Sequence, residues 1–179
     1  IKRANFILEL DENEEIKMLL LEIDNFDKWM SEFDEVQLKE IREKIKKIIN
    51  SSMNNKFDLK VFEDDLNRFC ILVSKSMDIY DTICGYAKNL KEMIEEKLDC
   101  SASIAISEPV AGIKSLAELY KQVDLAISYK FFKNIGSIIF YKNIKNMSMN
   151  HNLLEIDIDG LKDCIRENDT EGIKRKIKN

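Results

Sequence analysis

Two acidic residues stand at the end of an apolar run near the start of the sequence. The run covers residues 16–23, IKMLLLEI, and predicts a strand that is buried on both faces. Glu22 lies within this run, and Asp24 follows it, directly before an Asn-Phe pair that is typical of a turn. Carboxylates at the tip of a buried strand can hold metal ions for phosphate chemistry. Alternatively, such acids are members of structural ion pairs.

Length and composition predict one folded domain of ordinary size with a short appendage. The 179 residues are 45% hydrophobic and 34% charged, so a core can form beneath a solvated surface. The formal net charge of −5 disfavours a domain that binds the phosphate backbone of nucleic acids, because such domains carry a basic excess. No apolar run reaches the roughly 20 residues of a membrane-spanning helix, and no signal peptide is visible.

The cysteines and the single histidine do not form a metal-binding motif. No CxxC pair occurs and His151 stands alone, so a zinc site is not expected. Cys70 lies in the apolar run FCILV and is predicted to belong to the core. The irregular spacing of the cysteines suits a reducing, cytoplasmic location. They are Cys70, Cys84, Cys100 and Cys164.

Hydrophobic periodicity predicts a chain of the α/β (α+β) class. Strands are expected at 16–23, 56–64, 68–74, 100–107 and 136–141, and helices at 36–50, 78–98 and 115–130. The second and third strands flank the tripeptide DLN and are predicted to form an antiparallel hairpin. The order β-α-β-β-α-β-α-β predicts a mixed sheet with helices packed on it.

The same pattern predicts three segments along the chain. Residues 1–15 are expected to be the end of a preceding linker or helix, and residues 16–146 the α/β domain. Residues 147–179 are expected to form a helical tail with a break at Asp159-Gly160. Because neither end has the look of a natural terminus, the sequence resembles a segment of a longer protein.

Several segments together resemble the GGDEF domain of diguanylate cyclases. LLLEIDNFDKW, at 19–29, is similar to the first strand and turn of that family, LLLDIDNFKKIND. SASIAIS is similar to a later family strand, and 119–141 is similar to the final helix and strand, with Asp124 and Ala126 on the family's AD-x-A positions. The resemblance covers residues 16–142 and implies the palm-like mixed sheet of GGDEF and nucleotidyl-cyclase domains.

The family's signature is replaced in this sequence. The hairpin that reads RYGGDEF in the family reads EDDLNRF here, ending at Phe69. Asp65 and Leu66 stand where two glycines let the backbone approach the nucleotide, so their side chains would obstruct that approach. Asn67 and Arg68 stand where the family has two acids, and Arg68 brings a positive charge that should repel Mg²⁺.

Other positions of the resemblance also depart from the family. Glu22 replaces the first Asp with a longer side chain, while Asp24 is retained. The nucleotide-contacting K-x-x-N-D becomes DKWMS at 27–31, and the RxxD of the inhibitory product site is absent. The lysine of the family's YxAK falls on Phe131, with Lys130 adjacent. The resemblance therefore implies a domain without catalytic residues, metal or cofactor.

Glu22 and Arg68 form the sharpest structural hypothesis. Arg68 lies on the predicted hairpin and could pair with Glu22, so that a salt bridge takes the place of a bond between ligand and metal.

The end of the domain resembles a narrower group. Degenerate GGDEF-like domains in the middle of AraC-type two-component response regulators end in a similar YKFF and IIFY pattern, followed by a short helical segment similar to residues 153–179. This resemblance implies a receiver domain and an AraC-type helix-turn-helix domain as partners in the same chain. DNA would be bound only through the missing C-terminal domain; a homodimer is a further option, and no membrane is implied.

Three functions follow, in order of preference. The first is a non-catalytic regulatory domain that links receiver phosphorylation to DNA binding. The second is a sensor that binds GTP or a cyclic dinucleotide without turnover, with Asp24, Lys28 and Lys130 lining the pocket. The third is an active diguanylate cyclase, which would need an acid from elsewhere in place of Asn67 and Arg68.

Aromatic residues mark candidate contacts between domains, namely Trp29, Tyr129, Phe131 and Phe132. The alternatives are structural. Trp29 would then anchor the helix beside it, and the YKFF cluster would pack at the end of a helix.

Overall fold

A computed structural model describes residues 15–52, 58–74, 80–111 and 116–150 of the chain. The chain divides into two compact units, residues 1–142 and residues 143–179. The first unit contains the sheet and the candidate site. Most of the predicted N-terminal segment and most of the predicted C-terminal tail lie outside the described residues, as does the predicted break at Asp159-Gly160.

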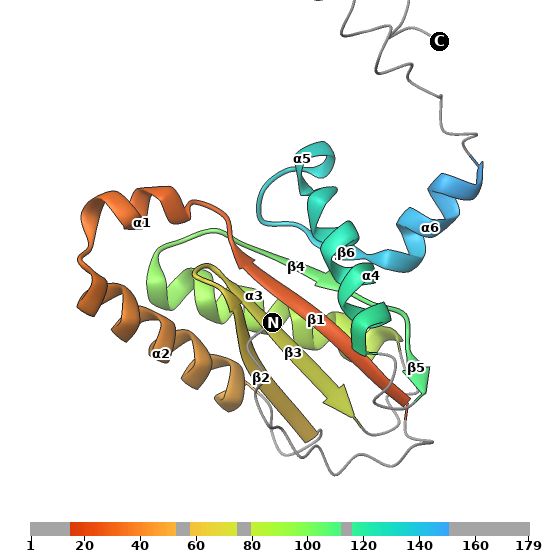
Figure 1. The fold of residues 1–179 in the computed structure, drawn as a ribbon, viewed down its shortest axis with the longest axis horizontal. Coiled ribbons are helices and arrows are strands. Elements are labelled where there is room, and N and C mark those ends of the chain that lie inside the picture. Colours follow the sequence, from red (N-terminus) through yellow and green to blue (C-terminus); the bar gives the residue numbers. More distant parts are fainter. Residues whose placement is uncertain (1–14, 53–57, 75–79, 112–115, 151–179) are drawn as a thin grey trace, which may run out of the picture. The chain divides into compact units, whose positions relative to one another are not determined.

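The element order agrees with the predicted alternation (Figure 1). The strands are β1 (Glu15–Ile23), β2 (Asp58–Asp65), β3 (Arg68–Ser74), β4 (Ala102–Ile106), β5 (Val110–Ala111) and β6 (Ile138–Phe140). The helices are α1 (Phe26–Glu32), α2 (Glu35–Ser51), α3 (Tyr80–Leu98), α4 (Leu116–Ser128), α5 (Lys130–Lys133) and α6 (Tyr141–Asn150). The predicted α+β class and the predicted hairpin of β2 and β3 are confirmed.

The strands form one mixed six-stranded sheet in the order β2-β3-β1-β4-β6, with β5 paired to the start of β1. All pairs are antiparallel except β4 and β6, which are parallel. Strand β1 lies at the centre, with β3 on one side and β4 on the other. Because of this central place, the apolar run of β1 is buried on both faces, as its composition predicts.

Side chains at alternate positions along a strand of the sheet pack against helices on opposite faces. Leu19, Leu21 and Ile23 of β1 belong to a core shared with apolar residues of α2 and α3. Helix α4 packs on β1 and β4, and Figure 1 shows it crossing in front of these strands while α3 lies behind the sheet. Glu22 has the opposite orientation to Leu21 and Ile23, so it belongs to the face that α4 covers.

Helix α2 illustrates how local sequence forms these layers. Asp34 accepts a hydrogen bond from the Gln37 backbone N–H at 2.8 Å, and the Gln37 side chain accepts one from the Asp34 N–H at 3.0 Å. This reciprocal capping box starts the helix. Leu38, Ile45 and Ile49 then fall on one face and are buried.

Short elements differ from the predictions. The turn expected after Asp24 contains α1, because Phe26 and Trp29 lie on one side of a helical turn and are both buried. Residues 110–111 of the expected loop form β5 by pairing with β1. The helix expected at 115–130 ends at Ser128, and Lys130 begins the separate short helix α5.

Two further predictions concern burial. Cys70 is buried in β3, and burial raises the pKa of its thiol to about 12, so it is a core residue as predicted. Within the described ranges, no helix is long and apolar enough to cross a membrane.

Replacing Ile49 by Ala tests the packing of α2. The Ile49 side chain is completely buried, so Ile49→Ala should lower the free energy of unfolding by about 2–5 kcal/mol. Val36→Ala on the same helix is the control, because Val36 is exposed and its replacement should change stability by about 0.5 kcal/mol at most. Urea denaturation followed by circular dichroism measures both. Equal effects would show that α2 does not pack as described.

Candidate functional site

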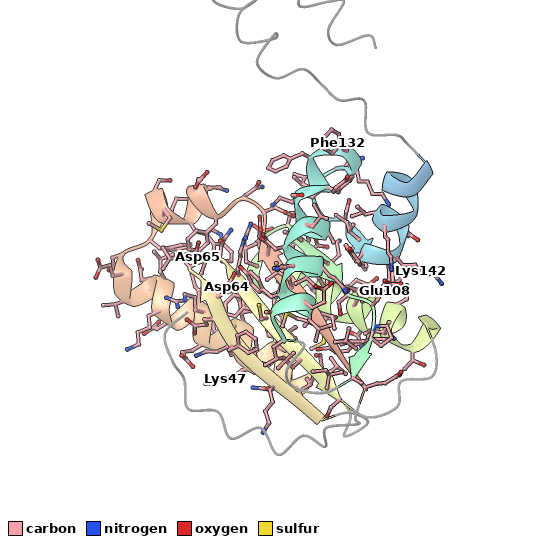
Figure 2. All side chains as sticks on the ribbon, turned by 45° about the vertical axis from the view of Figure 1, so that its right-hand side comes forward. Lys47, Asp64, Asp65, Glu108, Phe132 and Lys142 are labelled. Atoms are coloured by element: carbon pink, nitrogen blue, oxygen red, sulfur yellow. The ribbon has the colours of Figure 1, made fainter. Side chains whose placement is uncertain are left out.

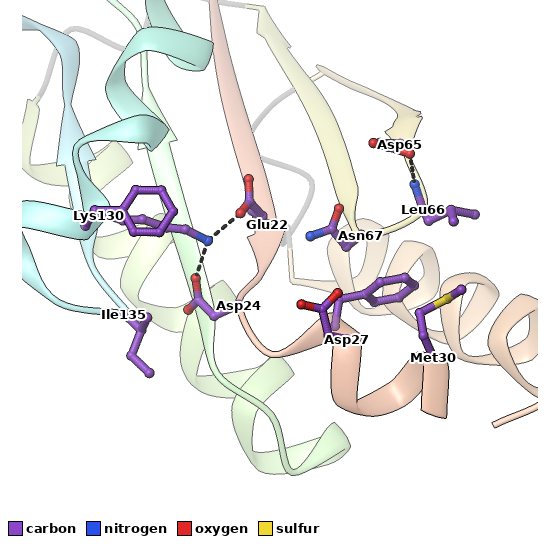
Figure 3. Close-up of a pocket in the computed structure, with 11 residues that line it drawn as sticks. Glu22, Asp24, Asp27, Met30, Asp65, Leu66, Asn67, Lys130 and Ile135 are labelled. Atoms are coloured by element: carbon purple, nitrogen blue, oxygen red, sulfur yellow. Dashed lines mark hydrogen bonds and ion pairs between the residues drawn. The ribbon is translucent and has the colours of Figure 1, made fainter. Parts of the chain in front are cut away.

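A pocket of about 490 Å³ opens where β1 ends and meets the β2–β3 hairpin (Figure 3). Its floor is charged and its rim is partly apolar. The lining residues are Glu22, Asp24, Phe26, Asp27, Met30, Asp65, Leu66, Asn67, Lys130, Phe131 and Ile135. The pocket therefore contains three of the four site residues predicted from sequence, Glu22, Asp24 and Asn67. The fourth, Arg68, contacts Glu22 from beside it.

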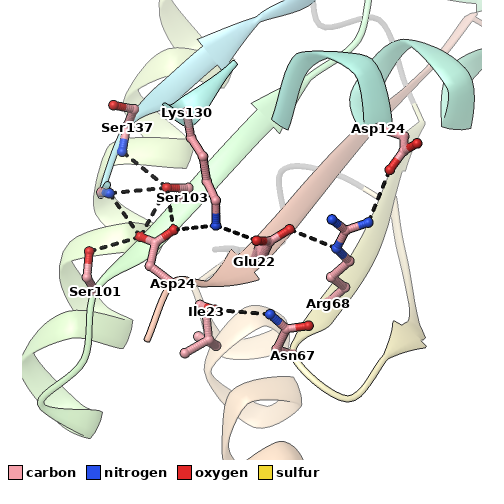
Figure 4. A network of polar contacts seen from close by, with 11 residues as sticks. Glu22, Ile23, Asp24, Asn67, Arg68, Ser101, Ser103, Asp124, Lys130 and Ser137 are labelled. Atoms are coloured by element: carbon pink, nitrogen blue, oxygen red, sulfur yellow. Dashed lines mark hydrogen bonds and ion pairs between the residues drawn. The ribbon is translucent and has the colours of Figure 1, made fainter. Parts of the chain in front are cut away.

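The register of the sheet positions Glu22. It lies directly opposite Arg68 of β3 and Ser103 of β4, and cross-strand partners present their side chains on the same face. The Arg68 Nε atom is 2.7 Å from Glu22 Oε2 (Figure 4). The predicted salt bridge between Glu22 and Arg68 is therefore confirmed.

Lys130 reaches the same carboxylate from the other side. Its Nζ atom donates a hydrogen bond to Glu22 Oε1 and another, 2.9 Å long, to Asp24 Oδ1. Residue Lys130 is only 6% exposed. The resemblance places the family's lysine on Phe131, with Lys130 adjacent; in the structure the separate short helix α5 turns Lys130 into the site, while Phe131 is exposed.

Asp24 is held by donors from three other residues. Ser101 Oγ donates to Oδ2 at 2.9 Å, and Ser103 Oγ donates to Oδ1 at 2.8 Å. The backbone N–H of Gly136 donates to Oδ2 at 2.9 Å. Gly136 has a φ of 75°, a conformation that side chains disfavour, so a glycine suits this position. With Lys130, these groups use the roughly four acceptor sites of a carboxylate.

The pKa values of this cluster are displaced toward charged forms. Burial by itself would raise the pKa of Asp24, but hydrogen bonds from Lys130, Ser103, Gly136 and Ser101 outweigh burial and lower it below its ordinary value of 3.8. Burial likewise would lower the pKa of Lys130, but hydrogen bonds to Glu22 and Asp24 raise it above 10.5. The Lys130 ammonium and the Asp24 carboxylate are thus both ionised at neutral pH.

Arg68 and Asn67 tie the hairpin to neighbouring elements. Arg68 Nη1 lies 3.1 Å from Asp124 Oδ1 on α4, so its guanidinium bridges Asp124 and Glu22. Burial would lower the pKa of Arg68, but the charges of Glu22 and Asp124 raise it. Asn67 Nδ2 donates to the Ile23 carbonyl at 3.1 Å, and the Ile23 N–H donates to the Asn67 carbonyl at 3.0 Å. The turn is therefore fastened to the end of β1.

The residues present do not fit a magnesium ion. Mg²⁺ needs near-octahedral oxygen ligands at about 2.0–2.1 Å. Each carboxylate oxygen of Glu22 faces a cationic side chain, and the Asp24 oxygens already accept from four groups. A metal ion would have to displace Lys130 and remain close to Arg68.

The other predicted residues are divided between core and surface. Trp29 is 7% exposed and packs edge-on against Phe26 and Phe33, which favours its structural interpretation as an anchor of α1. Lys28 does not line the pocket, and its ammonium lies 3.9 Å from Glu32.

The YKFF cluster lies at the surface. Phe131 and Phe132 are 82% and 85% exposed, and Tyr129 is half-buried with its ring centroid 5.7 Å from that of Phe132. Figure 2 shows the Phe132 ring at the outer end of the domain, far from the hairpin that carries Asp64 and Asp65.

Sequence reasoning missed Ser101, Ser103 and Gly136 as donors to Asp24. Ser103 carried a usable signal, since it is a hydroxyl residue inside the otherwise apolar strand ASIAI and must bond to a partner when buried. No comparable signal marks Gly136, whose contact depends on the approach of two distant segments.

Replacing Lys130 by Met tests the ion cluster. Lys130→Met leaves Glu22 and Asp24 close together without their shared cation, so unfolding free energy should fall by about 3–5 kcal/mol. Lys133→Met on the same helix is the control. Because Lys133 is exposed, its replacement should change the unfolding free energy by about 0.5 kcal/mol at most. Chemical denaturation measures both variants, and similar values would contradict a buried role for Lys130.

The lowered pKa of Asp24 predicts that the stability of the fold depends on pH. Because its folded pKa is depressed, its carboxylate contributes stability in full above the unfolded value of about 3.8, and the contribution is lost as pH falls through the lower folded value. Asp24→Asn should therefore be less stable than the wild type at neutral pH, and the gap should narrow as the pH falls below about 3.8. Urea midpoints across this range measure the gap; a constant gap would contradict the assignment.

Known proteins resemble this chain in fold. No protein-family model matches the sequence, and no curated protein sequence matches it. The structure is similar to the active GGEEF domain of a diguanylate cyclase from Vibrio cholerae, with a TM-score of 0.52 and 15% identity over 72% of this chain and 83% of that chain. It is also similar to the GGDEF domain of DgcB from Caulobacter crescentus in complex with c-di-GMP, with a TM-score of 0.54 and 9% identity over 72% and 79% of the two chains.

A third similar structure is the diguanylate cyclase SiaD from Pseudomonas aeruginosa in complex with its activator SiaC, with a TM-score of 0.58 and 10% identity over 70% of this chain and 50% of that chain. At such identities the likeness is one of fold. This chain therefore has the palm-like fold of the GGDEF domain of diguanylate cyclases.

Proposed function

We propose that this domain is a non-catalytic regulatory domain that acts through contacts with other protein parts. The observation that carries the proposal is the ion pair between Glu22 and Arg68. Glu22 occupies the position where the resemblance implies a metal-binding acid, and Arg68 the position of a signature acid. Two positions at which the resemblance implies acids thus hold an acid and a cation that neutralise each other.

Electrostatics at the pocket also disfavour nucleotide turnover. The lining contains four carboxylates, Glu22, Asp24, Asp27 and Asp65, and one ammonium, Lys130, so its formal charge is 4 × (−1) + 1 = −3. A nucleoside triphosphate is strongly anionic and would need bound metal to approach such a surface. The residues at the floor do not fit that metal.

The hairpin adds a steric argument. Asp65 and Leu66 both line the pocket, at the place where the resemblance implies glycines and close backbone approach. Leu66 is 47% exposed and lines the pocket, so its side chain fills space that a glycine would leave open.

The wider context of the proposal comes from the sequence resemblance. The domain would lie between a receiver and an AraC-type DNA-binding unit in a cytoplasmic response regulator and would couple phosphorylation to DNA binding. Such coupling requires two arrangements of an interface whose equilibrium the receiver shifts. The exposed Phe131 and Phe132 support a contact surface on this domain.

The alternative is a sensor that binds GTP or a cyclic dinucleotide without turnover. One observation favours it: Lys130 and Asp24 both reach the pocket, as that hypothesis requires. The pocket's acidic lining weighs against it, since these ligands carry negative phosphates.

Incubation of the chain with GTP and Mg²⁺ tests the proposal. We expect no cyclic dinucleotide by chromatography and no heat of GTP binding by titration calorimetry, because the acid pair is already compensated by Lys130 and Arg68. An active diguanylate cyclase assayed in parallel shows that the conditions support turnover.

Product formation would overturn the proposal. Heat of binding without product would instead support the sensor. In that case Lys130→Met should abolish the heat, whereas Lys133→Met should preserve it.

A further inference from the structure

The pocket has an apolar rim that its charged floor does not explain. Met30 and Leu66 are 49% and 47% exposed on one side, and Ile135 is 59% exposed on the other (Figure 3). Phe131 also lines the pocket and is 82% exposed. Among the residues that the structure describes, seven large apolar side chains are exposed, and these four surround a single opening. Apolar surface gathered in this way is typical of a site that another molecule covers.

The Phe131 ring is held over the pocket floor. The Lys130 ammonium lies 5.8 Å from the centroid of this ring, within the range of a cation–π contact. Lys130 is itself fixed by Glu22 and Asp24. This part of the rim is therefore positioned in advance, which lowers the entropy cost of covering it.

Two carboxylates at the mouth of the pocket are not compensated. Asp27 on α1 and Asp65 on the hairpin are both exposed. Asp65 accepts a hydrogen bond from the backbone N–H of Leu66 at 2.7 Å, and neither acid forms an ion pair with any residue in the described ranges. By contrast, Glu22 and Asp24 on the floor are paired with Lys130. The mouth therefore presents negative charge between two apolar sides.

This combination selects one kind of occupant. A purely apolar segment would cover the rim but would remove Asp27 and Asp65 from water without a partner, which is costly. A nucleotide would be repelled by the same acids, and a free polyamine would leave the apolar rim exposed. A lysine or arginine flanked by apolar side chains satisfies both features.

We infer that this pocket docks a segment of a partner protein in which a basic side chain, flanked by apolar residues, faces Asp27 and Asp65. The inference rests on the proposed function and deepens it, since it assigns the former nucleotide face to protein contact. The volume of about 490 Å³ suits a few side chains of such a segment.

Selection from a library of short random peptides tests the inference. The immobilised chain should enrich peptides that combine Lys or Arg with neighbouring apolar residues. Binding of a selected, fluorescently labelled peptide, followed by anisotropy, should weaken as salt is raised, because exposed charges are screened.

Variants locate the binding surface. Asp27→Asn and Asp65→Asn should each weaken binding about two- to fivefold, as for an exposed ion pair. Phe131→Ser should weaken it about tenfold, because buried aromatic anchors dominate such contacts. Matched controls are Glu40→Gln and Val36→Ser on α2, which alter exposed residues outside the pocket and should leave binding unchanged.

The outcomes separate this inference from the proposed function. No enriched peptide, enrichment of acidic peptides, or equal binding by all variants would overturn the docking inference while leaving the absence of turnover intact. Turnover of GTP would overturn the proposed function whatever the peptides do. All these substitutions are at exposed positions, and circular dichroism of each variant confirms that it is folded before binding is measured.

Discussion

Burial of the Glu22 carboxylate is the constraint around which this site is arranged. Glu22 lies on the central strand of the sheet, where a lone charge would cost several kcal/mol in lost hydration. Arg68 from the neighbouring strand and Lys130 from beyond α4 compensate this charge. Lys130 extends the compensation to Asp24, and Asp24 in turn binds Ser101, Ser103 and Gly136. One buried acid thus links strands β1, β3 and β4 with the segment around α5.

The cluster explains how a palm-like fold accommodates a buried acid at the end of its central strand. Without a cation, the Glu22 carboxylate would be an unpaired buried charge. Here Arg68 on the hairpin forms a pair with Glu22, so the acid on β1 is satisfied. The pocket above these ion pairs remains open, and Leu66 and Phe131 contribute apolar surface to its lining. An ion-paired floor and an apolar rim are therefore combined in the same few residues.

Much of the fold could be predicted because it depends on local patterns. The apolar run at β1 predicted a central strand, and the spacing of Leu38, Ile45 and Ile49 predicted α2. The hairpin followed from two strand-like runs around a short polar link. The pairing of Glu22 with Arg68 was also accessible, because the resemblance fixed which residues face each other across β1 and β3. The short elements α1, β5 and α5 were missed, since a few residues carry too little periodicity to be recognised.

The sequence by itself determined the layers of this protein, because local hydrophobic periodicity predicts the strands and helices. It also showed that the signature residues are absent, because that depends on residue identity alone. Only the tertiary structure decided which cation occupies the site. Phe131 and Lys130 are neighbours in sequence, and the resemblance aligned the family's lysine with Phe131. The break after Ser128 and the short helix α5 turn Lys130 inward and leave Phe131 at the surface. The carboxylates of Glu22 and Asp24 stabilise an ammonium there and would not stabilise an aromatic ring. This preference acts only once the distant segments have come together in the fold.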